Sequence, residues 1–281
     1  MTATLLSAIS VIKRNDMTYE VRGLVVRTVD LSGSDKLLTI LTAERGLITA
    51  VSNGSRSLKS RYLAASQLFC YASFVLESRR DRFWVREVEL IESFYELRLD
   101  IVNTALANYV CEVAGDVTVP EQPDPDILRT ALNALYAIAN NKYPLPVIKA
   151  AFEFRTAAML GYLPELSACL LCGEAEGEML LDVMNGSVVC SKCHASVERE
   201  LPRHEDDFAA RTRALLCILT PASRAALQYI LACPLERLFS FRLDEEDLRH
   251  LSHAAEEYLL NHLERGFKTL QFYKEVASGN L

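Results

Sequence analysis

Four of the eight cysteines lie within residues 169–193, in the stretch "CLLCGEAEGEMLLDVMNGSVVCSKC". Cys169 and Cys172 form one CxxC pair, and Cys190 and Cys193 form a second pair further along the chain. Two CxxC turns that face each other place four thiolates at the corners of a tetrahedron, and this spacing is typical of zinc sites. Because four thiolates leave no open coordination position, we predict that these residues bind a structural Zn²⁺ ion.

The residues between the two pairs indicate how the cysteines would meet. Asn185 and Gly186 are a preferred pair for a two-residue hairpin turn, and such a hairpin returns the second pair to the first. Gly173 suits a tight turn directly after Cys172. His194 adjoins the second pair, and we interpret it as a bystander because four thiolates are already available.

Other cysteine chemistries fit the spacing less well. A thioredoxin-like redox motif has a single CxxC that opens a helix after a strand, and a [4Fe–4S] site usually has more closely spaced cysteines. Cytosolic thiols stay reduced, so a tight cluster there more often binds metal than forms disulfides. The remaining cysteines lie in apolar contexts and are expected in the core: Cys70, Cys111, Cys217 and Cys233.

Residues 18–92 have the pattern of five short strands. The segments are rich in β-branched residues and are separated by turn signals: "TYEVRGLVVRTVDL", "KLLTILTA", "LITAVSNGS", "QLFCYASFVLES" and "FWVREVELIES". Five strands of this length fit a small closed barrel such as an OB-fold. An SH3-like barrel or a split sheet fits nearly as well, because periodicity alone does not distinguish these arrangements.

From residue 94 onward the apolar residues recur at steps of three and four, which predicts helices. Helix starts are indicated at Asp124, Thr220 and Asp244, and ends at Gly161 and Gly266. These helices lie on both sides of the cysteine segment. The cysteine segment therefore has the character of an insertion in a helical domain.

Charge is unevenly distributed along the chain, whose net charge is −7. The first 100 residues hold 14 Lys and Arg against 12 Asp and Glu, and the remainder holds 16 against 25. The stretch "RGLITAVSNGSRSLKSR" at 45–61 has four cations and no acidic residue. A polyanionic ligand would therefore contact the N-terminal part, the alternative being a solvated basic loop.

The sequence contains none of the common catalytic or nucleotide-binding motifs. GxxxxGK[ST], GxGxxG, HExxH and GxSxG are absent, and the five histidines form no pattern with a nucleophile. We therefore predict a binding protein that is not an enzyme. No apolar run approaches the roughly 18 residues of a membrane span, and the N-terminus lacks the features of a signal peptide, so we expect a cytoplasmic protein with no membrane partner.

The order of these segments resembles the RecO family of bacterial DNA repair proteins, from about residue 18 nearly to the end. A turn and a basic loop in the strand region are similar to the family's N-terminal motifs: Thr42, Glu44 and Gly46, then Gly54, Arg56, Lys59, Ser60 and Arg61. The segment "YLLNHLERGFKTLQFYKEV" is similar to the family's C-terminal helix pair. Two positions depart from the family's pattern: Ser34 in the strand region stands where many members have an acidic residue, and Thr269 stands where Ser is commoner.

The resemblance implies an α+β fold, with an N-terminal OB-fold β-barrel followed by an α-helical domain that carries a four-cysteine zinc insertion. We accordingly expect an OB-fold DNA-binding domain at 1–92, with 1–17 as an extension outside the resemblance. The helical domain would occupy 93–281, and the zinc-binding insertion 167–200.

The resemblance also implies a function in DNA repair and recombination. Members of the family bind single- and double-stranded DNA, anneal complementary strands without ATP, and act with RecR and the C-terminal tail of single-strand binding protein to load the RecA filament. This function implies association with the nucleoid. Five residues would contact DNA phosphates: Lys36, Arg45, Arg56, Lys59 and Arg61.

The sequence allows more than one role for several aromatic and arginine residues, and more than one function for the protein. Phe83 and Trp84 are candidates for stacking on bases, and Trp84 would equally well fill the barrel core. Four arginines are equally eligible to bind the tail of single-strand binding protein: Arg129, Arg155, Arg213 and Arg224. Two other functions are possible, namely a zinc-stabilised protein–protein adaptor without nucleic-acid binding and, ranked last, a thiol–disulfide exchange enzyme.

Overall fold

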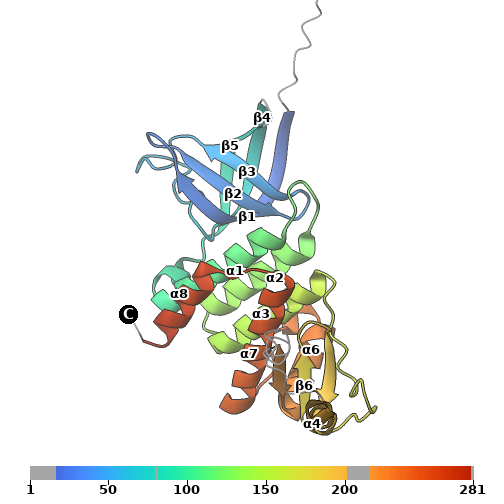
Figure 1. Cartoon of the computed structure of the whole chain (residues 1–281). Coiled ribbons are helices and arrows are strands. Elements are labelled where there is room, and N and C mark those ends of the chain that lie inside the picture. Colours follow the sequence, from blue (N-terminus) through green and yellow to red (C-terminus); the bar gives the residue numbers. More distant parts are fainter. Residues whose placement is uncertain (1–16, 80–81, 201–214, 280–281) are drawn as a thin grey trace, which may run out of the picture.

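A computed structural model describes residues 17–79, 82–200 and 215–279. Figure 1 shows a β-barrel at one end of the molecule, helices in the middle and a small sheet at the other end. The described residues include no helix that is both long and apolar enough to cross a membrane.

The barrel consists of five strands: β1 (Met17–Asp30), β2 (Lys36–Thr42), β3 (Gly46–Ser52), β4 (Tyr71–Arg79) and β5 (Arg82–Glu92). It closes in the order β1-β2-β3-β5-β4. All neighbours are antiparallel except β3 and β5, which are parallel. This is the connectivity of an OB-type barrel, so the α+β fold with an N-terminal OB-like sheet is confirmed and the SH3-like and split-sheet alternatives are wrong.

Strand alternation fills the barrel, and one strand also joins it to the helices. Val21 and Val25 of β1 face the barrel core, whereas Leu24 and Val26 belong to the core shared with the helices. The pairing of β1 with β2 shifts between Val25 and Arg27, which marks a β-bulge. Since a bulge places two consecutive side chains on one side of the strand, Arg27 points outward beside Val26.

The fourth strand begins later than the sequence pattern suggests. β4 starts at Tyr71, whereas the residues 67–70 before it form a turn. Phe69 has a φ of 70°, and its backbone N–H donates to the Val25 carbonyl at 3.0 Å. A left-handed residue cannot continue a regular strand, so the predicted start at residue 67 is wrong.

The described part of the middle of the molecule consists of six α-helices and two 3-10 helices: η1 (Tyr95–Arg98), α1 (Ile101–Val117), α2 (Pro125–Ala139), α3 (Leu145–Met159), α6 (Pro221–Ala232), η2 (Leu235–Arg237), α7 (Glu245–His262) and α8 (Lys268–Ala277). The three predicted helix starts are confirmed. Asp124, Thr220 and Asp244 each accept a hydrogen bond from the backbone N–H three residues later. Helix α7 ends at His262, four residues before Gly266.

A charged network lies inside the helical part. The Lys149 ammonium donates to Glu153 and to Glu256, with N–O distances of 2.9 Å. The Tyr109 hydroxyl donates to Glu153 at 2.8 Å, and Lys274 pairs with Glu256. Burial raises the pKa of Glu153 although Lys149 opposes the shift. The network links α1, α3, α7 and α8, and its buried carboxylate depends on Lys149.

We expect Lys149→Met to reduce the free energy of unfolding by about 3 kcal/mol, because it leaves the Glu153 carboxylate buried without its cation. Lys142→Met is the matched control, since Lys142 is exposed and forms no ion pair among the described residues. Urea unfolding of both variants measures the difference. Equal midpoints for the two variants would contradict a stabilising role for the network.

The connection between β2 and β3 contacts the loop after α1. Gly46 and Leu47 form β-bridges with Pro120, and the Asp124 N–H donates to the Ala43 carbonyl at 3.0 Å. Gly46 has a φ of +56°, and a Cβ there would lie 2.3 Å from the Val119 carbonyl oxygen. Only glycine therefore permits both the backbone conformation and the close approach of the two parts.

Gly46→Ala should lower the free energy of unfolding by about 3 kcal/mol or more, because strain at a positive φ is added to a backbone clash. Gly54→Ala is the control, since Gly54 has a φ of +66° and a Cβ attached there would meet no atom within 4 Å. This control should cost only about 1 kcal/mol. Chemical unfolding distinguishes the two, and equal losses would mean that the contact with the α1–α2 loop is unimportant.

Candidate metal centre and nucleic-acid interface

The cysteine segment forms a small sheet with an attached helix. Strands β6 (Met179–Asp182), β7 (Ser187–Cys190) and β8 (Leu216–Leu219) pair in the order β7-β6-β8, and α4 (Ser191–Glu200) follows β7. The predicted hairpin is confirmed, but its turn has four residues because Asp182 pairs with Ser187. The Asp182 carboxylate accepts hydrogen bonds from two backbone N–H groups of that turn, which stabilises it.

The hairpin brings the two CxxC pairs together. Gly173 adopts a φ of 76°, and its N–H donates to the Cys169 carbonyl at 2.9 Å, which closes the first turn as predicted. Cys190 is the last residue of β7, and Cys193 lies in the first turn of α4. The four sulfur atoms lie within 4.8 Å of one another.

The sulfur geometry fits a tetrahedral metal ion. With Zn–S bonds of about 2.3 Å, neighbouring sulfurs of a regular tetrahedron are about 3.8 Å apart. The Sγ atoms of Cys172 and Cys190 are separated by 3.8 Å, and all four cysteines are free thiols. The other four cysteines are buried elsewhere, as predicted, so these four residues form a group that could hold a metal ion.

Local hydrogen bonds prepare one sulfur for ionisation. Burial raises the pKa of Cys169, but the backbone N–H groups of Cys190, Cys172 and Leu171 outweigh burial and lower the pKa to about 6. Hydrogen bonds with Cys172 and Cys190 raise the pKa of Cys193 to about 12. The cluster thus accommodates a thiolate at Cys169 readily, and a bound cation would help to ionise Cys193.

The predicted basic loop lies between β3 and β4 and is exposed. Arg56 pairs with Asp30 at 3.4 Å and also donates to the Gly33 carbonyl. Lys59 is exposed, and Arg61 donates to the Tyr62 hydroxyl at 2.6 Å. The loop therefore presents three cations to solvent, one of them partly neutralised.

Lys36 and Arg45 do not join these cations. Lys36 is 9% exposed, and its ammonium donates to the Ser66 carbonyl and to Gln67, so it is not available to a phosphate. Its place follows from strand periodicity, because Lys36 shares the inward face of β2 with Leu38. The Arg45 guanidinium lies over the rings of Tyr19 and Phe83, at 4.4 and 5.8 Å from their centroids. We therefore remove Lys36 from the candidate contacts.

Phe83 and Trp84, the two candidates for stacking on bases, point to opposite sides of β5. Phe83 and Val85 pack against the barrel core. Trp84 lies between them on the strand and therefore points outward, half-buried, opposite Glu77 of β4. Trp84 is consequently the available stacking surface, and the interpretation that it fills the barrel core is wrong.

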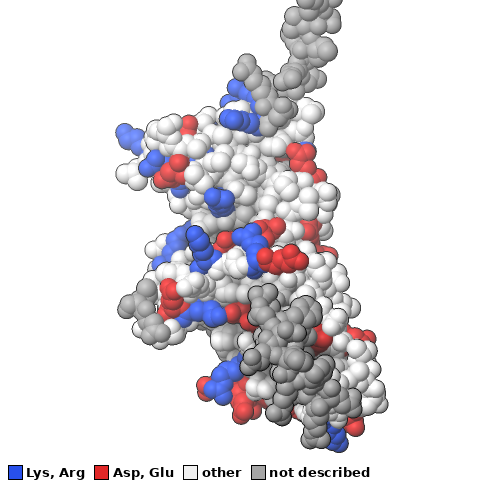
Figure 2. All heavy atoms as spheres, in the orientation of Figure 1, with Lys and Arg blue, Asp and Glu red and all other residues white. Residues whose placement is uncertain are grey.

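Three arginines near Trp84 were not among the sequence candidates. Glu77 pairs with Arg79 and Arg86, and Arg82 is exposed at the start of β5. Arg61 and the Tyr62 hydroxyl both donate to the Arg86 carbonyl, which holds the basic loop beside β5. We call these cations the arginine face: Arg61, Arg79, Arg82 and Arg86. Figure 2 shows blue side chains at the top and along one edge of the barrel.

The sequence offered one signal for this face. The segment "SRRDR" is rich in arginine, but only the register of β4 against β5 shows that Arg79 and Arg82 lie on the strand ends near Trp84. The arginines considered for the tail of single-strand binding protein are scattered. Arg155 and Arg224 donate to backbone carbonyls, Arg129 pairs with Glu236, and Arg213 lies outside the described residues.

A closed OB-type barrel, joined to helices that carry a four-cysteine cluster, defines the chain as an OB-fold protein with a potential metal centre. The family model "Recombination protein O N terminal" matches residues 17–94, and "Recombination protein O C terminal" matches 98–214 and 208–271. The chain belongs to the recombination protein O (RecO) family.

Full-length relatives support this assignment. The chain is 30% identical to the DNA repair protein RecO of Acetivibrio thermocellus, over 90% of this chain and 95% of that protein. It is 31% identical to the protein of the same name from Symbiobacterium thermophilum, over 92% and 98% of the two chains. The family indicates a role in DNA repair.

We expect Cys169→Ser to abolish metal binding and to leave the protein partly unfolded or insoluble, because a closed metal site contributes free energy of folding. Cys217→Ala is the matched control, since Cys217 is buried in β8 of the same sheet but lies outside the cluster. Metal content by mass spectrometry and the near-UV circular dichroism are the measurements. A fully folded Cys169→Ser protein without metal would contradict the architectural role.

Proposed function

We propose that the protein is a non-enzymatic mediator of DNA repair and recombination. It binds single- and double-stranded DNA through the barrel and anneals complementary strands without ATP. It acts with RecR and single-strand binding protein to load the RecA filament, and it works at the nucleoid. Family membership supports the DNA-repair role, and these finer steps are what the proposal adds.

The observation that carries the proposal is the arginine face around Trp84. OB barrels bind single strands through cations that contact phosphates and through aromatic rings that stack on bases. Trp84 points outward opposite Glu77, and Arg86, two residues further along β5, pairs with the same Glu77. Arg61 of the β3–β4 loop donates to the Arg86 carbonyl. Arg56 and Lys59 extend the same basic surface along the β3–β4 loop.

The contacts that hold the arginine face in place also explain why it would suit a DNA strand. Glu77 is 8% exposed and pairs with two arginines, so it orients their guanidinium groups while it neutralises only part of their charge. Arg61 lies 4.8 Å from the Tyr62 ring centroid, which restricts its side chain. Ordered cations lose less entropy on binding a phosphate than free ones do.

We further propose the domain organisation and the identity of the metal. Residues 1–92, with 1–17 as an extension, would form the DNA-binding domain, and 93–281 the helical domain with its insertion at 167–200. Four cysteine sulfurs select Zn²⁺ or an iron–sulfur cluster over hard cations, and sulfurs that all lie within 4.8 Å of one another suit a single ion, which favours zinc. Cys169, Cys172, Cys190 and Cys193 would hold it, and with no open position it would stabilise the fold rather than react.

The decisive measurement is fluorescence anisotropy of a labelled single-stranded oligonucleotide at several salt concentrations, without nucleotide. We expect binding that weakens steeply with salt, because it depends on phosphate contacts. Alanine at Arg56, Lys59 and Arg61 together should reduce affinity by about tenfold or more at low salt. The salt slope should fall by roughly two to three units, since each lost contact removes about 0.7 to 0.9.

The matched control removes three exposed arginines from the helical part: Arg129, Arg242 and Arg249. It changes the net charge equally, so its affinity should remain close to that of the parent. If the loop variant bound as tightly as this control at every salt concentration, the proposed surface would be wrong. If the parent failed to bind even at low salt, a zinc-stabilised protein–protein adaptor would be favoured.

A further inference from the structure

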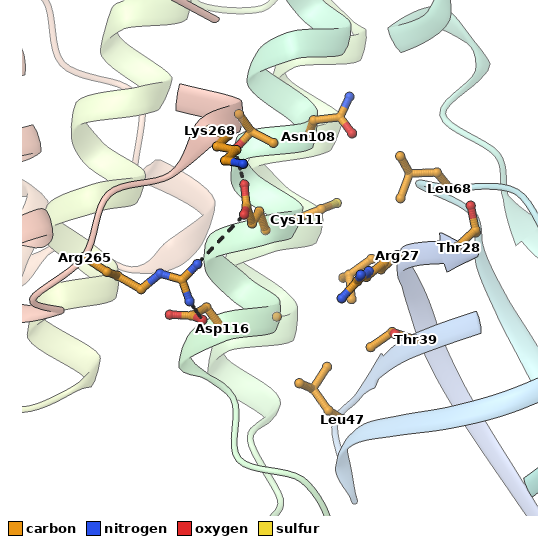
Figure 3. A pocket seen from close by; sticks show the side chains of 14 residues that line it. Arg27, Thr28, Thr39, Leu47, Leu68, Asn108, Cys111, Asp116, Arg265 and Lys268 are labelled. Atoms are coloured by element: carbon orange, nitrogen blue, oxygen red, sulfur yellow. Dashed lines mark hydrogen bonds and ion pairs between the residues drawn. The ribbon is translucent and has the colours of Figure 1, made fainter. Parts of the chain in front are cut away.

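A cleft separates the barrel from the helices beside the bulge in β1. Its volume is about 660 Å³, within the range of small-molecule sites. Figure 3 shows Arg27 on the barrel side and Lys268 on the helical side. Neutral polar groups add hydrogen-bonding capacity to both walls: Thr28, Thr39 and Asn108.

The cleft contains more positive than negative charge. Three cations line it, namely Arg27, Arg265 and Lys268, against the carboxylates of Glu112 and Asp116. Both carboxylates are already occupied on the helical wall. Arg265 pairs with each of them, and the Thr269 hydroxyl donates to Glu112 at 2.5 Å (Figure 3).

The other two cations differ from Arg265 in their surroundings. Within the described part of the chain, neither Arg27 nor Lys268 forms an ion pair or a side-chain hydrogen bond. Arg27 is exposed on β1 and Lys268 is exposed at the start of α8. Two such cations on opposite walls, with hydroxyl and amide donors between them, match an anion with several acceptor oxygens.

We propose that this cleft is a phosphate-binding site, with Arg27 and Lys268 as its two cationic contacts. The site takes either a backbone phosphate of a DNA strand or a free phosphate compound. The inference deepens the proposed DNA-binding function, because it names a second contact that joins barrel and helices. Its chemistry does not depend on that function, because a free phosphate compound would bind the same groups.

The first test uses thermal unfolding of the full-length protein in inorganic pyrophosphate, compared with chloride at equal ionic strength. A ligand that binds only the folded state raises Tm, and we expect a rise of about 2 °C or more for the parent. The double variant Arg27→Ala/Lys268→Ala should lose this rise. The double variant Arg242→Ala/Arg249→Ala should keep it, because neither arginine lines the cleft.

The second test measures anisotropy of a single-stranded oligonucleotide with the same variants. Backbone binding predicts that Arg27→Ala/Lys268→Ala loses about tenfold in affinity, with a salt slope that falls by roughly one and a half to two units. An unchanged DNA affinity, together with a lost response to pyrophosphate, would assign the site to free phosphate compounds.

Two results would overturn the proposal. One is a parent whose Tm does not respond to pyrophosphate, and the other is a cleft variant that responds as the parent does. If the parent binds no DNA but its pyrophosphate response depends on Arg27 and Lys268, the proposed function fails while the phosphate site stands.

Discussion

The two-sided burial of β1 is the constraint on which the rest of the structure depends. One face of the strand fills the barrel with Val21 and Val25, and the other packs Leu24 and Val26 against the helices. Burial of each such side chain stabilises the fold by about 1.5 to 3 kcal/mol. Val26 lies over Gly115 of α1, where an added Cβ would meet it at an ordinary contact distance of 3.5 Å, so the barrel cannot turn on the helices without exposing this apolar surface.

This constraint fixes where charged groups can lie. Because strand alternation uses Phe83 and Val85 for the barrel core, Trp84 must face outward, where the arginines of β4 and β5 surround it. The bulge in β1 directs Arg27 into the cleft in the same way. The cysteine cluster lies at the opposite end of the molecule from the barrel (Figure 1), so a metal bound there would support the helical part and would not contact DNA at the proposed barrel surface.

The features predicted from sequence are those set by short-range rules. CxxC spacing, the Asn185–Gly186 turn and helix caps such as Asp124 each depend on a few neighbouring residues. The features missed depend on pairing between distant segments. The position of strand β8 depends on its pairing with β6. The arginines of the arginine face become neighbours only because of the register between β4 and β5. Lys36 is an intermediate case, because its inward direction follows from period two along β2.

The net charge of −7 does not prevent this chain from binding a polyanion, because charges act over short distances in salt. The Debye length is about 8 Å at physiological ionic strength. A DNA strand at the proposed barrel surface would therefore interact mainly with the charged groups directly beside it. In the cleft, two carboxylates of α1, Glu112 and Asp116, line the same space as Arg27 of the barrel. Arg265 pairs with Glu112 and Asp116 there, and it would thereby keep the α1 wall from repelling a phosphate at the site proposed for Arg27. Without Arg265 the cleft would hold two cations against two carboxylates, so this arginine accounts for the net positive charge at the junction, although it belongs to the acidic part of the sequence.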